Sequence, residues 1–201
     1  MTHPGVSLDF TLRLVAQEVE SAGLRDVIAA IGVGGKAGGV VCHGVNGAAM
    51  ELLNLSDVAT DCVLAFEPVA FEAGKPLEER IAADITVVGD ADRLRRLISI
   101  LLDNAVKYGA EGGHITLTLE KTDRQARLTV SNPGDPIPPE HLAHLFERFY
   151  RADASRGEKS GFGLGLAIAD TIAREHKGAL KAESDAASTR FTFTIPLRKQ
   201  A

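Results

Sequence analysis

The feature that most constrains the fold of this chain is a change of hydrophobic period in its second half. Between Leu94 and Ala105 the apolar residues recur every three or four positions, as they do on a helix face that packs against a large neighbour. Asp90 can cap the start of this helix. Residues 115–119 and 126–130 then alternate apolar and polar side chains, as paired antiparallel strands with one buried face do. The chain is therefore predicted to contain a helix layer and a sheet layer that share a core.

Other segments extend this pattern on both sides. A helix is expected after Ser56, which can cap it, with a kink at Pro68. Its apolar side is expected to carry Val58, Cys62, Val63, Phe66 and Val69. The remaining expected elements are extended pieces at 77–81 and 85–88, a short helix at 140–146, a helix at 164–176 closed by Gly178, and strands at 180–183 and 191–195. Because strands and helices alternate in pairs, we predict an α/β (α+β) two-layer sandwich, a mixed sheet covered on one face by helices.

Composition excludes several classes of protein. With 45% hydrophobic and 24% charged residues, the 201-residue chain is neither disordered nor fibrous. It lacks a signal-peptide pattern and any run near the roughly 18 apolar residues of a membrane-spanning helix, so we expect a cytoplasmic chain without direct membrane insertion. A net charge of -5 argues against nucleic acid as a partner. The two cysteines, Cys42 and Cys62, have neither disulfide-scaffold nor zinc-site spacing.

The first 47 residues differ in character from the rest. They contain an amphipathic stretch at 7–22, an apolar run at 24–31, and then seven glycines from Gly32 to Gly47, which is typical of a linker. A phosphate-binding P-loop is disfavoured because Lys36 is followed by alanine rather than serine or threonine. We predict an N-terminal helical and glycine-rich segment at 1–47, and a second domain at 48–201.

Four stretches carry polar, aromatic and glycine residues that a structural core does not need. They are LLDNAVKYG at 101–109, SNPGDPIP at 131–138, FERFYRAD at 146–153 and GFGLGL at 161–166. In this order they resemble the N box, first glycine box, F box and second glycine box of the ATP-binding catalytic domain of sensor histidine kinases, in the GHKL superfamily. The resemblance spans about residues 51–197. It implies a Bergerat-type fold, ATP and Mg²⁺ as ligands, and the cytoplasmic part of a membrane-anchored sensor.

The N box places three different chemistries on one helix face. Asn104, Lys107 and Tyr108 stand at positions i, i+3 and i+4. The asparagine oxygen suits Mg²⁺, the lysine can neutralise phosphate, and the tyrosine ring can lie beside a purine. From this helix alone an alternative stays open. In it, the amide of Asn104 is hydrogen-bonded within the protein, Lys107 is a solvated charge and Tyr108 belongs to the core.

The second glycine box is expected to open a helix. Gly161, Gly163 and Gly165, with Leu164 between them, let backbone N–H groups approach phosphate oxygens at a helix N-terminus. A flexible helix entry is the structural alternative.

A local group of cations precedes these glycines in an otherwise acidic chain. It consists of Arg148, Arg151, Arg156 and Lys159, beside Phe149 of the F box. A polar loop with cations that ends in glycines is typical of a lid over a triphosphate. Read singly, Arg156 and Lys159 are solvated surface charges.

The first glycine box departs from the common pattern of the family. Asn132 stands where an aspartate recognises the adenine amino group, Gly134 is kept, and Pro136 replaces the second glycine. An amide oxygen still accepts a hydrogen bond from the amine, although without charge assistance. Ile137 is expected to pack near the base.

Ile100, four residues before Asn104, is the most informative departure. In the ATP-hydrolysing relatives this position holds a glutamate that activates water, and isoleucine is neither a base nor a metal ligand. Efficient hydrolysis is therefore disfavoured, whereas transfer of the γ-phosphoryl group to a nucleophilic imidazole remains. No histidine of the chain is followed by the acceptor motif, in which glutamate or aspartate and then proline follow; the six are His3, His43, His114, His141, His144 and His176.

The sequence thus predicts the ATP-binding half of a protein-histidine kinase, inactive alone. Its partner is a separate dimerisation and phosphotransfer domain that carries the histidine, and indirectly a response regulator. The alternative is a non-catalytic nucleotide-binding regulatory module that acts through partner binding. The predicted catalytic residues are Lys107, Arg148 and Arg151, and the metal ligand is Asn104. The predicted nucleotide-binding residues are Asn104, Lys107, Tyr108, Asn132, Gly134, Ile137, Phe149, Gly161, Gly163, Leu164 and Gly165.

Overall fold

The computed structural model describes residues 50–150 and 163–198 of the chain. In chain order the elements are β1 (Glu51–Asn54), α3 (Leu55–Glu72), β2 (Leu77–Ile81), β3 (Thr86–Gly89), α4 (Ala91–Tyr108), β4 (Ile115–Lys121), β5 (Gln125–Asn132), α5 (Pro139–Leu142), α6 (Gly165–Glu175), β6 (Ala179–Ser184) and β7 (Thr189–Pro196).

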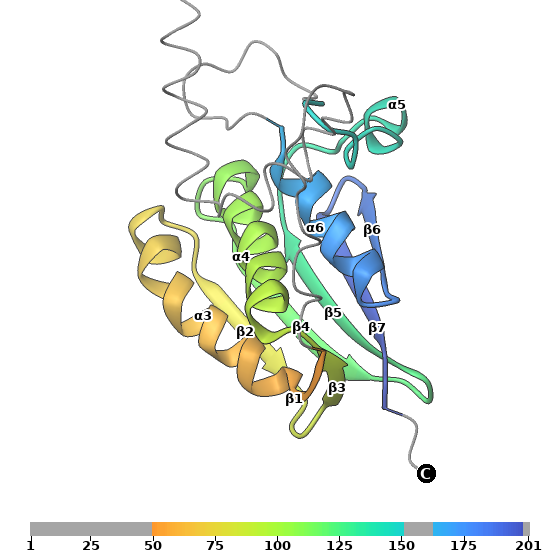
Figure 1. The fold of residues 1–201 in the computed structure, drawn as a ribbon. Helices are drawn as coiled ribbons and strands as arrows, with labels where there is room; N and C mark the ends of the chain where they lie inside the picture. Colours follow the sequence, from red (N-terminus) through yellow and green to blue (C-terminus); the bar gives the residue numbers. More distant parts are fainter. Residues whose placement is uncertain (1–49, 151–162, 199–201) are drawn as a thin grey trace, which may run out of the picture. The chain divides into compact units, whose positions relative to one another are not determined.

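Five strands form a mixed sheet in the order β2-β4-β5-β7-β6 (Figure 1). β2 runs parallel to β4, with Leu77 opposite Ile115, and the other three pairs are antiparallel. The predicted antiparallel pair is β4 and β5, where Leu117 lies opposite Val130. β1 and β3 form a separate two-stranded antiparallel sheet that the sequence pattern does not indicate.

Helices α3, α4 and α6 cover one face of the five-stranded sheet (Figure 1). The predicted apolar stripe of α4 is buried along its whole length: Leu94, Leu97, Ile98, Leu101, Leu102 and Ala105. From the sheet side, Leu117, Leu128 and Phe193 are fully buried. The predicted two-layer sandwich, a mixed sheet with helices on one face, is confirmed.

The cap of α3 differs from the prediction. Asn54 is the N-cap, and its Oδ1 accepts a hydrogen bond from the N–H of Ser56 at 3.0 Å. The hydroxyl of Ser56 instead donates to the carbonyl of Ala82 at 2.7 Å and accepts from the N–H of Ile85 at 3.1 Å. The prediction of Ser56 as the cap is wrong because its hydroxyl forms hydrogen bonds with backbone groups of the loop between β2 and β3.

The buried side of α3 is also narrower than predicted. Val58, Cys62 and Val63 are buried, Phe66 is half-buried, and Val69 is 49% exposed. The predicted kink position, Pro68, lies within the helix. Burial raises the pKa of the Cys62 thiol, which therefore stays protonated at neutral pH.

The C-terminus of α6 is closed by Gly178, as predicted, and the residue before it has positive φ. Lys177, with φ 56°, adopts the left-handed conformation, and the N–H of Gly178 bonds to the carbonyl of Ala173 at 2.9 Å. Gly178 is required for another reason, because a Cβ there would lie 2.2 Å from the carbonyl oxygen of Thr194. The predicted closure of α6 by Gly178 is confirmed, with Lys177 as the left-handed residue.

His176 links α6 to the start of α4. The side chain is only 4% exposed. Its Nδ1–H donates to the carbonyl of Ile172 at 2.8 Å, and its Nε2 accepts from the N–H of Asp90 at 3.0 Å. Asp90 is the predicted N-cap of α4, and its carboxylate accepts from the N–H groups of Asp92 and Arg93.

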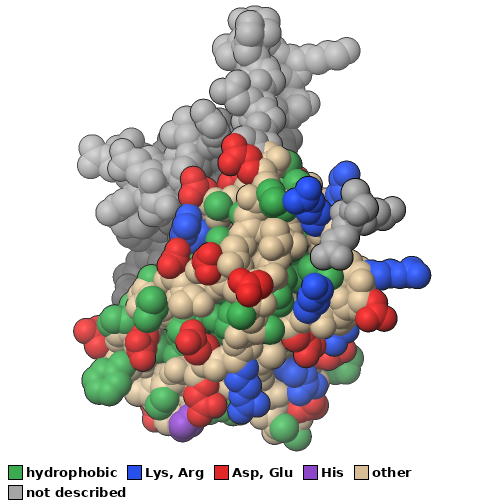
Figure 2. All heavy atoms as spheres, turned by 90° about the horizontal axis from the view of Figure 1, so that it is seen from below, with side chains coloured by type: hydrophobic (Ala, Val, Ile, Leu, Met, Phe, Trp, Pro, Cys, Tyr) green, Lys and Arg blue, Asp and Glu red, His purple; other side chains and the backbone are tan. Residues whose placement is uncertain are grey.

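The short helix predicted at 140–146 is confined to α5, and the chain continues in turns from residue 143. The predicted boundary near Gly47 and the glycine-rich linker lie outside the described residues and stay predictions. Within the described ranges, none of the helices combines the length and the apolar character needed to cross a bilayer. Seen from below, acidic and basic side chains are interspersed, with hydrophobic side chains between them (Figure 2).

Candidate functional site

The N box occupies the C-terminal half of α4. Asn104 is half-buried, and within the described ranges its side-chain amide has no hydrogen-bond partner. Lys107 and Tyr108 are exposed, the tyrosine by 51%. The alternative that Tyr108 belongs to the core is therefore wrong. The helix face presents an amide, a cation and a ring together, as its spacing predicts.

Lys107 has a partner that the sequence analysis does not name. Its Nζ lies 2.7 Å from Oδ2 of Asp103, in an i, i+4 ion pair whose side chains are 42% and 50% exposed. An exposed pair of this kind is weak in water, so the lysine can exchange this carboxylate for another anion. The helical spacing of the two residues is the signal that could have revealed the pair.

The first glycine box lies against the end of α4. The N–H of Ala110 bonds to the carbonyl of Pro133 at 2.7 Å. A Cβ on Gly134 would lie 3.1 Å from the carbonyl oxygen of Tyr108, and a Cβ on Gly109 would lie 3.5 Å from Cβ of Asn132. The contact at Gly134 is tight enough that a Cβ there would require the neighbouring backbone to move by a few tenths of an ångström, whereas the distance from Gly109 to Asn132 is ordinary van der Waals contact. The structure thus brings the first two predicted motifs together.

Asn132 and Ile137 bound the first glycine box. Asn132 ends β5, is 3% exposed, and donates through Nδ2 to the carbonyl of Pro133 at 3.2 Å. Its Oδ1 is thereby left as an acceptor. The N–H of Ile137 donates to Oγ of Ser184 at 2.9 Å, so the far end of the box is held by the last residue of β6. The sequence has no local signal for this use of Ser184.

The F box and the second glycine box are joined by the backbone. The N–H of Phe149 bonds to the carbonyl of Gly163 at 3.0 Å. Both residues have positive φ, 64° and 71°, and a Cβ on Gly163 would lie 2.7 Å from the carbonyl oxygen of Tyr150. Gly163 is therefore needed for both its conformation and its close approach. The side chain of Phe149 is 59% exposed.

The second glycine box leads into α6 and faces α4. Leu164 is the N-cap of α6 and makes no side-chain cap bond, so among the described residues the first N–H groups of the helix have no side-chain cap. A Cβ on Gly165 would lie 3.4 Å from Cγ2 of Ile100, which is half-buried. Ile100 therefore lies where the second glycine box meets the helix that carries the N box.

The predicted cations are only partly described. Arg148 is exposed, and no ion pair or hydrogen bond of its side chain occurs among the described residues. Arg151 and Gly161 lie outside the described residues, as do Arg156 and Lys159. The roles of all these residues stay predictions.

The histidines near α5 have local partners. Nδ1 of His141 lies 2.6 Å from the hydroxyl of Tyr150, and Nδ1 of His144 lies 2.8 Å from a carboxylate oxygen of Glu147. The ring of His144 also lies 5.4 Å from that of Tyr150. In the part of the chain that the structure describes, no three His, Cys, Asp or Glu side chains are grouped closely enough to hold a metal ion.

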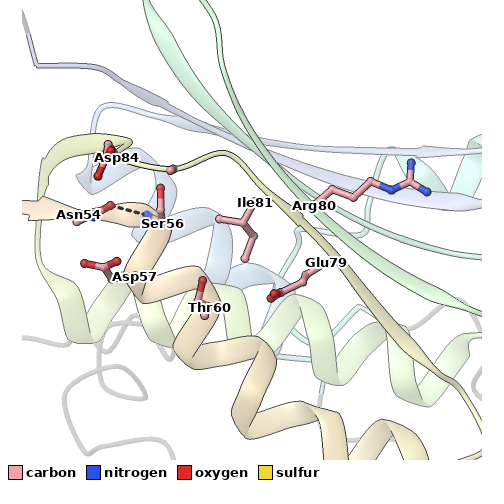
Figure 3. A pocket seen from close by; sticks show the side chains of 9 residues that line it. Asn54, Ser56, Asp57, Thr60, Glu79, Arg80, Ile81 and Asp84 are labelled. Carbon is pink, nitrogen blue, oxygen red and sulfur yellow. Dashed lines mark hydrogen bonds between the residues drawn. The ribbon is translucent and has the colours of Figure 1, made fainter.

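A pocket of about 510 Å³ lies at the other end of the helix layer, beside the start of α3 (Figure 3). Its lining includes the carboxylates of Asp57, Glu79 and Asp84. The side chain of Arg80 points away from this group in Figure 3. Phosphates would be repelled by three carboxylates, so this pocket does not suit a nucleotide.

Comparisons with known proteins agree with this arrangement. Residues 89–199 match the family described as histidine kinase-, DNA gyrase B-, and HSP90-like ATPase. The sensor histidine kinase CusS of Escherichia coli (strain K12) is 43% identical over 148 residues, which cover 73% of this chain and 30% of CusS. The sensor protein DltS of Streptococcus agalactiae serotype III (strain NEM316) is 35% identical over 145 residues, 72% of this chain and 37% of DltS. The chain thus spans 30% to 37% of the length of these relatives.

Solved structures show the same fold. The catalytic domain of the histidine kinase ThkA superposes with a TM-score of 0.65 at 28% identity, over 74% of this chain and 95% of that domain. The mycobacterial sensor histidine kinase MprB gives a TM-score of 0.66 at 28% identity, over 75% of this chain and all of the other (100%). The chain therefore belongs to the histidine kinase-, DNA gyrase B- and HSP90-like ATPase family, and within it to the ATP-binding catalytic domains of sensor histidine kinases.

Proposed function

We propose that this chain binds Mg-ATP around the C-terminal half of α4 and donates its γ-phosphoryl group to a histidine on a separate helical hairpin. One observation carries the proposal: motifs far apart in sequence converge on this half-helix. Gly134 lies against the carbonyl of Tyr108, and Gly165 lies against Ile100. Phe149 is joined to Gly163 across the intervening segment.

The base end of the site would lie at the first glycine box. The free Oδ1 of the buried Asn132 can accept a hydrogen bond from the exocyclic amine of adenine. Tyr108 and Ile137 offer apolar surface beside it. Gly134 keeps the backbone close enough for a flat base to enter. Phe149 is exposed at the F box and would contact the nucleotide from that side.

The phosphate end would lie between α4 and the start of α6. Among the described residues no side chain caps the start of α6, and the N–H groups at Gly163, Leu164 and Gly165 suit phosphate oxygens, aided by the helix dipole. Lys107 would exchange Asp103 for a phosphate. Arg148, Arg151 and Gly161 complete the proposed set of phosphate-side residues.

Asn104 is the residue that would hold Mg²⁺. Its amide is half-buried and has no partner among the described residues, and one neutral oxygen suits an ion that takes its other ligands from phosphates and water. A bound magnesium ion would neutralise phosphate charge. Asn104 itself would orient the phosphate end of the nucleotide relative to Lys107.

The proposed reaction needs no base from this chain. The lone pair of an acceptor imidazole nitrogen forms the N–P bond while the bond from the γ-phosphorus to its bridging oxygen breaks, and ADP leaves. Ile100 offers no group to activate water at this place. We infer that transfer is favoured over hydrolysis, that the acceptor is supplied by a dimerisation and phosphotransfer domain, and that a response regulator receives the phosphoryl group next.

We also propose that the domain begins near residue 48, after the helical and glycine-rich segment at 1–47. The cytoplasmic location rests on the absence of a spanning segment from the sequence and stays a prediction.

Thermal unfolding with and without nucleotide tests the site. Millimolar ATP or ADP with magnesium should raise Tm, since a ligand present at about 100 times its Kd stabilises the native state by about 2.7 kcal/mol. Asn104→Ala should weaken triphosphate binding by roughly 1 to 3 kcal/mol and reduce its dependence on magnesium. Glu79→Ala, at the acidic pocket, is the matched control and should leave affinity unchanged. If the protein is folded and its Tm is the same with and without nucleotide, the proposal is wrong.

A further inference from the structure

Lys75 is an unusual residue of this domain because it is a buried cation. Its exposure is 8%, and it is the only lysine or arginine among the buried residues that the structure describes. Lysine is rarely buried without a polar partner, because removal of the ammonium group from water is costly. It lies between α3 and β2, outside all four motifs of the proposed nucleotide site.

The backbone of Lys75 is held on both sides. Gly74, with φ 66°, ends α3, and its N–H bonds to the carbonyl of Phe71 at 2.9 Å. The N–H of Lys75 itself bonds to the carbonyl of Ala70 at 2.9 Å, which completes a Schellman motif. On the other side of Lys75, the carbonyl of Pro76 accepts a hydrogen bond from the N–H of Ile115 at 2.8 Å, where β2 begins to pair with β4. These bonds set the direction in which the side chain leaves the backbone.

The ammonium group of Lys75 donates to the carbonyl oxygen of Val106, in the last turn of α4. The last four carbonyls of a helix have no partner within the helix, and a cation near them is also favoured by the helix dipole. Lys75, from the connection between α3 and β2, therefore provides a hydrogen-bond donor for one of the last carbonyls of α4.

The chain just after this turn is also bonded to the residue that follows β5. The N–H of Ala110 bonds to the carbonyl of Pro133, and the N–H of Gly109 closes the helix on Ala105. Asn104 and Lys107 flank Ala105 and Val106 in sequence, so a shift of this turn moves both of their side chains.

We propose that Lys75 is a positioning residue that fixes the last turn of α4, and through it Asn104, Lys107 and Tyr108, for the nucleotide. This inference rests on the proposed function. Lys75 acts through the carbonyl of Val106 rather than by contact with the nucleotide. Its role is thus distinct from that of the four motifs.

Three variants test the role of Lys75. Lys75→Met keeps the length and removes the donor and the charge, Lys75→Arg keeps both, and Lys181→Met removes an exposed lysine of β6 as the matched control. The first measurement, without nucleotide, is hydrogen exchange at the N–H groups of Gly109 and Ala110. We expect exchange at least about fivefold faster in Lys75→Met, because the last turn opens more often, and no change in the other two variants.

The second measurement is the Kd for Mg-ATP, well below every Tm. We expect Lys75→Met to weaken binding by about three- to tenfold, less than loss of a direct contact with a charged group, and Lys75→Arg to restore it within about twofold. In an Asn104→Ala background the effect of Lys75→Met should shrink, since both changes act on one turn.

The outcomes separate the two proposals. If the wild type binds and Lys75→Met binds equally well, the positioning role is wrong and the proposed function stands. If the wild type does not bind nucleotide, the proposed function falls, and so does the positioning role for it, while exchange still shows whether Lys75 holds the turn. Should Lys75→Met not fold, Lys75→Gln takes its place, since it removes the charge and its shorter side chain carries the amide away from the carbonyl of Val106. Exchange and affinity unchanged in that variant would also overturn the inference.

Discussion

At the scale of single residues, we propose that Ile100 makes the site favour phosphoryl transfer over ATP hydrolysis. Its side chain lies beside Gly165, at the start of α6, and four residues before Asn104. An isoleucine here has packing value but no proton to give or take. The side chain is half-buried, so a polar residue at this position can stay in contact with solvent.

Replacement of Ile100 by glutamate should therefore create ATP hydrolysis. We expect turnover to rise by as much as about 100- to 10,000-fold, the range that a positioned general base supplies. Phosphate release with purified Ile100→Glu measures it, and Ile100→Gln, which is matched in size but not a base, should remain slow. Equal rates in both variants, with both folded, would show that Ile100 does not face the γ-phosphate.

Asp103 should oppose nucleotide binding. Its Oδ2 forms an ion pair with Nζ of Lys107 at 2.7 Å, and its negative charge lies near the proposed phosphates. Asp103→Asn should therefore tighten ATP binding by about two- to fivefold, as expected from release of an exposed pair, with a smaller effect at high salt. Titration calorimetry measures it. Asp92→Asn removes a carboxylate paired with Arg95 in the first turn of the same helix and should change nothing. Weaker binding in Asp103→Asn would instead make Asp103 a ligand of the site.

At the scale of elements, the hairpin of β6 and β7 supports the first glycine box through Ser184. Its turn is held by Asp185, whose carboxylate pairs with Arg190 at 2.7 Å and accepts the N–H groups of Ala187 and Ser188. The hydrogen bond from Arg190, and then the two backbone bonds, lower the pKa of Asp185 from 3.8 to about 2. A carboxyl whose folded-state pKa is lowered adds stability above its unfolded pKa and loses it as pH falls towards the folded value.

The hairpin should therefore show a pH dependence confined to acid. We expect the Tm of Asp185→Asn to lie below that of the wild type at pH 7 by no more than about 2 °C, as for an exposed pair. The difference should shrink as pH falls from 3.8 to about 2, where the wild-type carboxyl itself becomes protonated. Calorimetry over this range measures it. Asp123→Asn, in the turn between β4 and β5, is the control. A difference that persists unchanged at pH 2 would assign the effect to something other than the charge.

At the scale of the whole molecule, the described domain offers a place for ATP, and none of its own histidines is followed by the acceptor motif. His141 and His144 are engaged with Tyr150 and Glu147, and His176 is buried between α4 and α6. The remaining histidine of the described residues, His114, lies 3.2 Å from a carboxylate of Glu78. We propose that the phosphoryl acceptor is a histidine of another domain.

The chain alone should bind ATP without stable autophosphorylation and without appreciable turnover. Mixed with radiolabelled ATP and a separate histidine-containing hairpin, it should place label on that hairpin as acid-labile phosphohistidine. Asn104→Ala should abolish the labelling, and a hairpin with its histidine replaced by glutamine is the control. Rapid turnover by the chain alone, lost in Asn104→Ala, would contradict the assignment and direct attention to Asp103 as a base.

The sequence by itself determined the parts whose signal is local. α4 and the β4–β5 pair follow from hydrophobic periods, because each period depends only on residues a few positions apart. The order of the four motifs indicated the family, and the comparisons confirm it. Which helix face would carry Asn104, Lys107 and Tyr108 also followed from spacing alone.

Only the tertiary structure decided the choices in which several local solutions were equivalent. Asn54 and Ser56 are both good caps, and Asn54 serves because the hydroxyl of Ser56 is used by Ala82 and Ile85. The four residues of β1 are too few to show a period, and pairing with β3 makes them a strand. The burial of Lys75 against Val106 depends on the packing of α3 beside α4. Contacts between residues tens of positions apart leave no periodic trace in the sequence, and the chain reveals them only once its layers have packed.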